Sequence, residues 1–258
     1  MKEQYVGDIS DYRKYALLRA LAASGTNRMG VCWMLTAPDG RADGGKLAYL
    51  QQPERYRAFD PDLFDMLAHV AAEPDRRRLG SIEASEAVPG ATYFNAAMSD
   101  DLLGRSAYMA ACQSALATAE LIFFDPDNGL EVALRKGRKG SSKFLYLDEV
   151  ATFYAAGKSL LVYQHFPRVE REAFIQDCAA RLRGVAPDAD LWAFRTAHVV
   201  FLLLLHPSSP PSLVKAGRAA CNRWPSDFVR GYPVSSPPSD PLAQLLVELE
   251  GDAASGRG

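Results

Sequence analysis

Two kinds of hydrophobic pattern alternate along residues 11 to 205. Apolar side chains recur at the spacing of one helical face, which predicts helices near residues 11–23, 59–73, 106–119, 147–156 and 168–182. Short apolar runs typical of buried strands lie between them, at residues 30–35, 93–94, 121–124, 159–163, 191–194 and 199–205. This alternation predicts an α/β fold with a mostly parallel sheet and helices on both faces.

Proline and serine crowd the chain beyond residue 206, at 207–211 and again at 235–238. We therefore predict one α/β domain over residues 1–206 and a Pro/Ser-rich C-terminal extension over 207–258, with the last residues disordered. The most apolar run, 199–205, is far shorter than the roughly 20 residues that a membrane-spanning helix needs. It is better explained as a buried strand.

Composition narrows the class of protein. With 258 residues, 48% of them hydrophobic, the chain can bury one sizeable core. A formal net charge of −2 argues against a global basic field for nucleic acid, although local patches remain possible. The polar N-terminus does not resemble a signal peptide, so we expect a cytoplasmic protein with reduced thiols. No pair of cysteines has zinc-site spacing; they are Cys32, Cys112, Cys178 and Cys221.

A polar loop follows the apolar run 121–124 at once, with the sequence Asp-Pro-Asp-Asn-Gly over residues 125–129. In an open α/β sheet, ligands bind at the carboxyl ends of the strands. Two nearby carboxylates, Asp125 and Asp127, can share a proton or bind a cation. The ordinary alternative is a tight turn, because these residue types all favour turns. We expect the chemistry of the protein to centre on Asp125.

A second polar cluster lies where the chain enters its first predicted helix. Asp8, Asp11, Lys14 and Tyr15 fall within one or two turns of the helix start. Free backbone N–H groups and the helix dipole at such a start favour an anionic ligand group. The alternative is a solvated first turn that Ser10 or Asp11 caps.

The order of these features resembles the single-domain bacterial 23S rRNA adenine-N6 methyltransferases, which use S-adenosylmethionine (SAM). Residues 5–15, YVGDISDYRKY, match the family's opening segment, with Gly7, Asp11 and Lys14 in register. The loop at Asp125 stands where the family has its catalytic Asp-Pro-Pro-Tyr.

Further along the chain, residues 161–167, LVYQHFP, stand where that family has a strand ending in Trp-Tyr-Pro. A helix and an apolar hairpin ending in proline follow over 168–207. The resemblance implies a Rossmann-like, methyltransferase-type fold.

The resemblance also implies roles for individual residues. The protein would transfer a methyl group from SAM to a nucleobase or another planar amine, with Asp125 orienting the amine and Lys14 meeting the methionine carboxylate. The residues assigned to the catalytic site are Asp125, Asp127, Asn128 and His165. The residues assigned to the cofactor are Gly7, Lys14, Tyr15 and Thr36.

Two departures from the family keep other functions open. Residues 33–40 lack the Gly-x-Gly through which a backbone approaches the cofactor closely, which favours a non-catalytic binding protein. Asp127 and Asn128 replace the second proline and the aromatic residue that stacks on the target base. The fold therefore carries over better than the reaction.

The second carboxylate also allows a metal-dependent nuclease or phosphohydrolase. Asp125 and Asp127, with Glu131, would hold Mg²⁺ or Mn²⁺. His165 or Lys136 would then lie near the phosphate.

A basic segment follows the Asp125 loop, with five cationic residues among nine. It favours contact with nucleic-acid phosphates, or else it is a solvated loop. The residues concerned are Arg135, Lys136, Arg138, Lys139 and Lys143.

Overall fold

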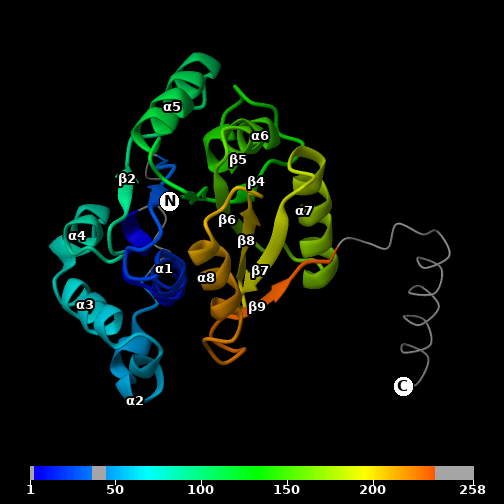
Figure 1. Ribbon diagram of the computed structural model, residues 1–258. Helices are drawn as coiled ribbons and strands as arrows, with labels where there is room; N and C mark the ends of the chain where they lie inside the picture. Colours follow the sequence, from blue (N-terminus) through cyan, green and yellow to red (C-terminus); the bar gives the residue numbers. More distant parts are fainter. Residues whose placement is uncertain (1–2, 37–44, 236–258) are drawn as a thin grey trace.

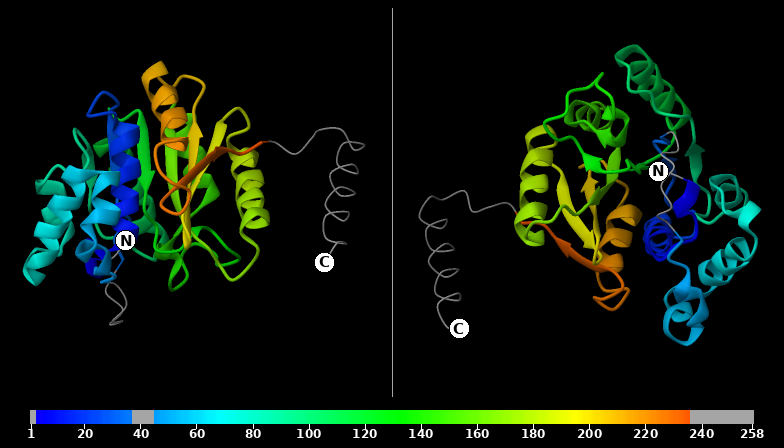
Figure 2. Two further views of the ribbon diagram at one scale, coloured as in Figure 1. Left: turned by 90° about the horizontal axis from the view of Figure 1, so that it is seen from below. Right: turned by 180° about the vertical axis from the view of Figure 1, so that it is seen from behind.

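The computed structural model describes residues 3–36 and 45–235 (Figure 1). Within them, a seven-stranded sheet in the order β2-β1-β3-β6-β8-β7-β9 has helices on both faces, as the alternating pattern predicted (Figures 1 and 2). The C-terminal residues predicted to be disordered lie outside the described ranges. The fold is a Rossmann-like α/β fold.

Five of the seven strands run in one direction. β2, β1, β3 and β6 pair in parallel, whereas β8 runs antiparallel to both β6 and β7, and β9 runs antiparallel to β7. The hairpin of β7 and β8 is the apolar hairpin that the sequence predicted. The strands are β1 (Met29–Cys32), β2 (Thr92–Phe94), β3 (Leu121–Phe124), β6 (Ser159–His165), β7 (Asp190–Arg195), β8 (Val199–Leu205) and β9 (Arg230–Pro233), with a separate pair β4 (Gly129–Leu130) and β5 (Phe144–Leu145).

The helices form two layers around the sheet. On one face lie α1 (Ile9–Ala22) and α8 (Pro211–Cys221), with α2 (Pro53–Tyr56), α3 (Pro61–Ala72) and α4 (Leu79–Ala84) beside α1 (Figure 2). On the other face lie α5 (Leu102–Ala115), α6 (Leu147–Ala155) and α7 (Arg171–Val185). Short 3-10 helices are Glu3–Tyr5, Ala48–Gln51, Arg57–Phe59, Pro74–Arg76 and Ser141–Lys143.

Strand β3 illustrates why continuous apolar runs form this sheet. Leu121 and Phe123 point into the core shared with α1, whereas Ile122 and Phe124 point into the core shared with α5 to α7. All four are fully buried. A strand covered on both faces has no polar side to show in the sequence.

Three element boundaries differ from the predicted ones for local reasons. Asp8 rather than Ser10 or Asp11 caps α1, because its carboxylate accepts hydrogen bonds from the N–H groups of residues 10 and 11. β1 ends at Cys32, and Met34 then takes a left-handed conformation with φ of 47°. α5 begins at Leu102 because Asp101 caps it.

Residues beyond 206 add to the same sheet. Leu213, Ala216 and Ala220 recur at helical spacing along α8 and are buried on the sheet. β9 pairs with β7 and forms one edge of the sheet. The sheet therefore extends past the predicted domain boundary, into the segment that the sequence analysis treated as an extension.

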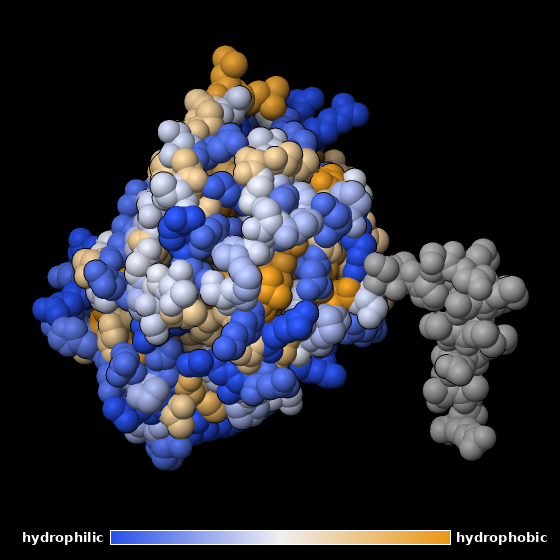
Figure 3. All heavy atoms as spheres, in the orientation of Figure 1, coloured by the Kyte–Doolittle hydropathy of each residue, from blue (hydrophilic) through white to orange (hydrophobic). Residues whose placement is uncertain are grey.

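The surface is mixed in character. The face in Figure 3 is mostly polar, with apolar residues in small groups. Among the residues that the structure describes, no helix is long and apolar enough to cross a membrane.

The order of the strands places Asp125 at a special position. The chain leaves β1 for β2 on one side and later returns to β3 on the other side of β1. Ligands of open α/β sheets bind at such a reversal, outside the carboxyl ends of the strands. Asp125 follows β3 there, and its backbone N–H donates to the carbonyl of Cys32 at the end of β1 (3.1 Å).

Candidate active site at the reversal of strand order

A buried ion triad joins the N-terminal helix to this edge of the sheet. The Lys14 Nζ atom lies 2.8 Å from Asp11 Oδ1 and 2.8 Å from Asp125 Oδ2. Each of the three side chains is only 4% exposed. Lys14 and Asp125 are 111 positions apart in the chain, so the fold alone brings them together.

The second oxygen of Asp11 organises the turn before α1. Asp11 Oδ2 accepts hydrogen bonds from the Gly7 N–H (3.2 Å) and from the Tyr15 hydroxyl (3.1 Å). The Gly7 carbonyl accepts in turn from the Tyr49 hydroxyl (2.9 Å). Gly7 has a φ of 83°, which favours glycine. Gly7, Lys14 and Tyr15, all predicted from the resemblance, therefore lie around the carboxylate of Asp11, which the sequence suggested only as a helix cap.

The charges of the triad shift one another's proton affinity. Burial raises the pKa of Asp11 to about 6, and the nearby Lys14 ammonium opposes that shift. Burial also disfavours the Lys14 ammonium, but Asp11 and Asp125 together outweigh it and hold the pKa of Lys14 above its ordinary value. At pH 7 Asp11 is thus mostly ionised and Lys14 is protonated.

Aromatic rings complete the enclosure of the ammonium. Lys14 Nζ lies 5.1 Å from the ring centre of Tyr15 and 5.4 Å from that of Trp33. Trp33 stacks on Tyr93 and donates its Nε1–H to Glu83 (2.9 Å). Two carboxylates and two rings therefore surround one cation.

A second contact joins the ends of β1 and β3. The Thr36 hydroxyl donates to Asp127 Oδ2 (2.6 Å), and Asp127 is half-buried. Asp125 and Asp127 thus have different partners. No group of three or more His, Cys, Asp or Glu side chains suited to a metal ion occurs within residues 3–36 and 45–235.

Gln164, which the sequence analysis did not assign, fixes the loop after Asp125. Its Nε2 donates to the Asn128 carbonyl (3.1 Å), and its Oε1 accepts from the Leu130 N–H (2.7 Å). The Gln164 amide lies directly against Gly129, where an added Cβ would come within 2.3 Å of Oε1. The signal in the sequence is an uncharged polar residue directly after the apolar run 160–163.

His165 and Asn128 lie at the outer part of the site. Both side chains are exposed, and the backbone N–H of His165 donates to the backbone carbonyl of Asn128 (3.3 Å). Val162 pairs with Phe124, so His165 lies further out along β6 than the level of Asp125. Partial burial and, secondarily, Lys46 lower the pKa of His165, which keeps it neutral at pH 7.

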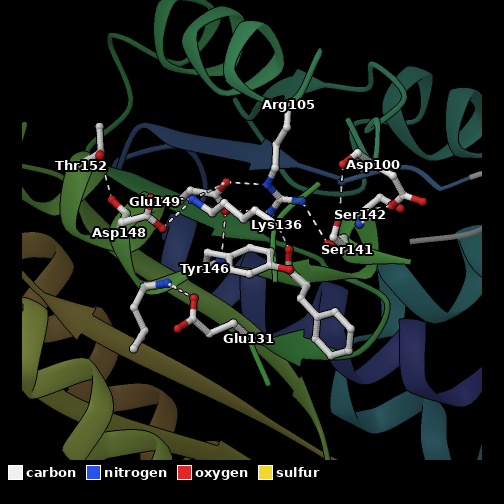
Figure 4. A network of polar contacts seen from close by, with 12 residues as sticks. Asp100, Arg105, Glu131, Lys136, Ser141, Ser142, Tyr146, Asp148, Glu149 and Thr152 are labelled. Atoms are coloured by element: carbon white, nitrogen blue, oxygen red, sulfur yellow. Dashed lines mark hydrogen bonds and ion pairs between the residues drawn. The ribbon is translucent and has the colours of Figure 1, made fainter. Parts of the chain in front are cut away.

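The predicted basic segment is partly bound into the fold (Figure 4). The Lys136 Nζ atom lies 2.5 Å from Asp148 and 3.3 Å from Glu149, so carboxylates compensate its charge. Arg105 is 2% exposed and binds both oxygens of Glu149, at 2.6 and 2.8 Å. This network holds residues 131–146 between α5 and α6.

The other basic residues of that segment lie nearer the surface. Arg135, Arg138 and Lys139 are exposed, and Lys143 is half-buried. The Lys143 carbonyl accepts from the Asn128 N–H (3.0 Å), which places the end of the segment against the Asp125 loop.

Comparisons of the chain with protein-family models, with curated proteins and with solved structures found no match. A functional assignment must therefore come from the residues and their geometry.

Proposed function

We propose that this protein is a SAM-dependent methyltransferase whose acceptor amine docks at Asp125. The observation that carries the proposal is the 2.8 Å contact between Lys14 and Asp125. The resemblance needs the N-terminal segment and the Asp-Pro loop to meet at the carboxyl edge of the sheet. They do so at the reversal of strand order, where α/β sheets bind ligands.

The charges around the reversal suit this cofactor. Three carboxylates and one ammonium lie close together there, those of Asp8, Asp11, Asp125 and Lys14. Asp127 follows Asp125 by two positions in the chain. This excess of negative charge favours a ligand with a net positive charge, such as SAM, whose sulfonium and ammonium outnumber its one carboxylate. SAM would supply an electrophilic methyl group when bound.

The chain's own residues would orient the acceptor. Asp125 would accept a hydrogen bond from the amine, because ionised carboxylates are strong acceptors. Lys14 fixes the orientation of the Asp125 carboxylate through the 2.8 Å ion pair. We therefore assign Lys14 a positioning role. Its enclosure by two carboxylates and two rings favours this role over the contact with the methionine carboxylate that the resemblance implies.

The metal-dependent alternative has less support. Asp125 is paired with Lys14, and Asp127 accepts a hydrogen bond from Thr36, so each carboxylate already has a partner of its own. A hard divalent cation needs several oxygen ligands at once.

Calorimetric titration with SAM tests the proposal first. We expect saturable binding by the wild type, by Asp125→Asn and by the control Asp177→Asn, whose exposed carboxylate lies on α7. Transfer of a labelled methyl group to a panel of RNA, DNA and small amines follows, with melting curves to verify folding. We expect transfer by the wild type and the control and its loss in Asp125→Asn.

Two results would contradict the proposal. If the folded wild type does not bind SAM at millimolar concentration, SAM is not its cofactor. If Asp125→Asn transfers the methyl group at the wild-type rate, Asp125 does not take part in the reaction.

A further inference from the structure

A pocket of about 470 Å³ lies at the edge of the sheet opposite to Asp125. Its lining includes Arg28, Glu120 and Lys158, which directly precede β1, β3 and β6. Ser209, which follows β8, lines it as well. These three strands are parallel, so the pocket lies at their amino ends, remote from the candidate active site at their carboxyl ends.

Lys158 holds a fixed positive charge in this pocket. Its Nζ donates to the carbonyls of Ala117 (2.5 Å) and Ala119 (2.8 Å), which are neutral acceptors. No ion pair among the described residues includes Lys158. An ammonium has three N–H donors, so one more bond can be made from a side chain that is already held in place.

The one carboxylate in the lining is already engaged. Glu120 binds the Arg28 guanidinium through Oε1 (2.9 Å) and the Arg28 N–H through Oε2 (3.0 Å). The lining therefore carries one net positive charge from Arg28, Lys158 and Glu120.

The start of helix α8 adds to the positive electrostatic potential in the pocket. It begins at Pro211, next to the lining residue Pro210, and Pro210 provides no side-chain cap. The positive end of the helix dipole at such a start favours an anion. Thr118 and Ser208 also line the pocket, and the Ser208 hydroxyl is hydrogen-bonded to His206 Nδ1 (2.7 Å).

We propose that this pocket binds a phosphorylated small molecule through its phosphate, with Lys158 as the charged donor. Pockets for small organic ligands measure about 300 to 1,000 Å³, and a lone phosphate is far smaller than such ligands. The room in the pocket therefore favours a phosphate ester over the inorganic ion. The site is independent of the methyltransferase proposal.

Calorimetric titration with glycerol 3-phosphate, inorganic phosphate and glycerol tests this site. We expect saturable binding of glycerol 3-phosphate, weaker binding of inorganic phosphate and none of glycerol. Lys158→Met should weaken glycerol 3-phosphate binding by about tenfold or more, because a hydrogen bond to a charged group is lost. The control Lys215→Met, an exposed lysine on α8, should bind like the wild type.

Replacing Lys158 also removes its hydrogen bonds to the carbonyls of Ala117 and Ala119, which changes the pocket wall as well as its charge. A second pair of variants therefore tests the charge of the pocket while Lys158 stays unchanged. Thr118 is exposed at the pocket wall, so Thr118→Glu adds a negative charge there and Thr118→Gln is its neutral match. We expect the Glu variant to bind glycerol 3-phosphate more weakly than the Gln variant, with a difference that shrinks at high salt. Equal affinity of these two variants, or no binding by the wild type at millimolar ligand, would overturn the proposal.

Discussion

Replacing Lys14 by methionine should strongly destabilise the protein at pH 8. The change removes the one ammonium that lies between Asp11 and Asp125 and leaves both carboxylates buried. Methionine has a similar length and fills most of the same space. The loss of stability therefore measures the removal of the charge rather than the opening of a cavity.

The size of the effect follows from the geometry. At 2.8 Å, each ion pair has a gross Coulomb energy of about 6 kcal/mol at an effective dielectric of about 20. Much of this offsets the cost of burying the three charges. Removing one member of a buried ion pair typically destabilises by about 3–5 kcal/mol, since a charge remains without its partner.

Urea unfolding at pH 8 and pH 5 measures this prediction. We expect a loss of about 3–5 kcal/mol at pH 8 that shrinks at pH 5, because protonation relieves the repulsion between Asp11 and Asp125. Lys14→Met combined with Asp125→Asn should recover part of the loss. The exposed control Lys215→Met should change stability by less than about 0.5 kcal/mol. A loss below about 1 kcal/mol that does not depend on pH would refute the buried triad.

Three further changes probe other contacts by urea unfolding. The raised pKa of Asp11, from 3.8 to about 6, makes the folded state hold a proton that the unfolded chain has released. Stability should therefore fall by up to about 3 kcal/mol as pH rises from 4 to 6, and Asp11→Asn should flatten that slope. Gly129→Ala, at a φ of 113°, should destabilise by at least about 1 kcal/mol, whereas Gly184→Ala, in open space on α7, should stabilise slightly. Arg105→Met should cost about 3–5 kcal/mol, less if Glu149→Gln is also present.

The hydrophobic pattern predicted some elements with their observed bounds and missed others. The runs 121–124 and 199–205 became β3 and β8 unchanged, because strands buried on both faces are apolar throughout. The start of α5 lay four residues earlier than predicted, because a capping side chain rather than the apolar face sets it. β9 has the sequence RGYP and shows no apolar strand pattern. It lies at the edge of the sheet and is not buried on both faces, so its side chains need not be apolar for its backbone to pair with β7.

The candidate site was predictable as a set of residues and not as a set of contacts. Asp125 was identified because a carboxylate ends a buried strand, and Lys14 because of the resemblance. Their contact depends on how α1 packs beside the sheet, which no local pattern encodes. The ion pair of Asp11 was not predicted for the same reason. A carboxylate near the start of a helix is typical of a cap, and only the fold shows that it contacts the Lys14 ammonium.

The net charge of −2 conceals a separation of charge between the two edges of the sheet. At the carboxyl ends, the carboxylates of Asp11 and Asp125 outnumber the ammonium of Lys14. At the amino ends, Lys158 carries a positive charge that no carboxylate of the described residues compensates, while Arg28 and its partner cancel. The net charge of the whole chain adds these local excesses of opposite sign, so it does not reveal either of them. The net charge therefore excludes a global basic field but gives no information on local excesses of charge, on which the proposed cation site at one edge and the proposed anion site at the other depend.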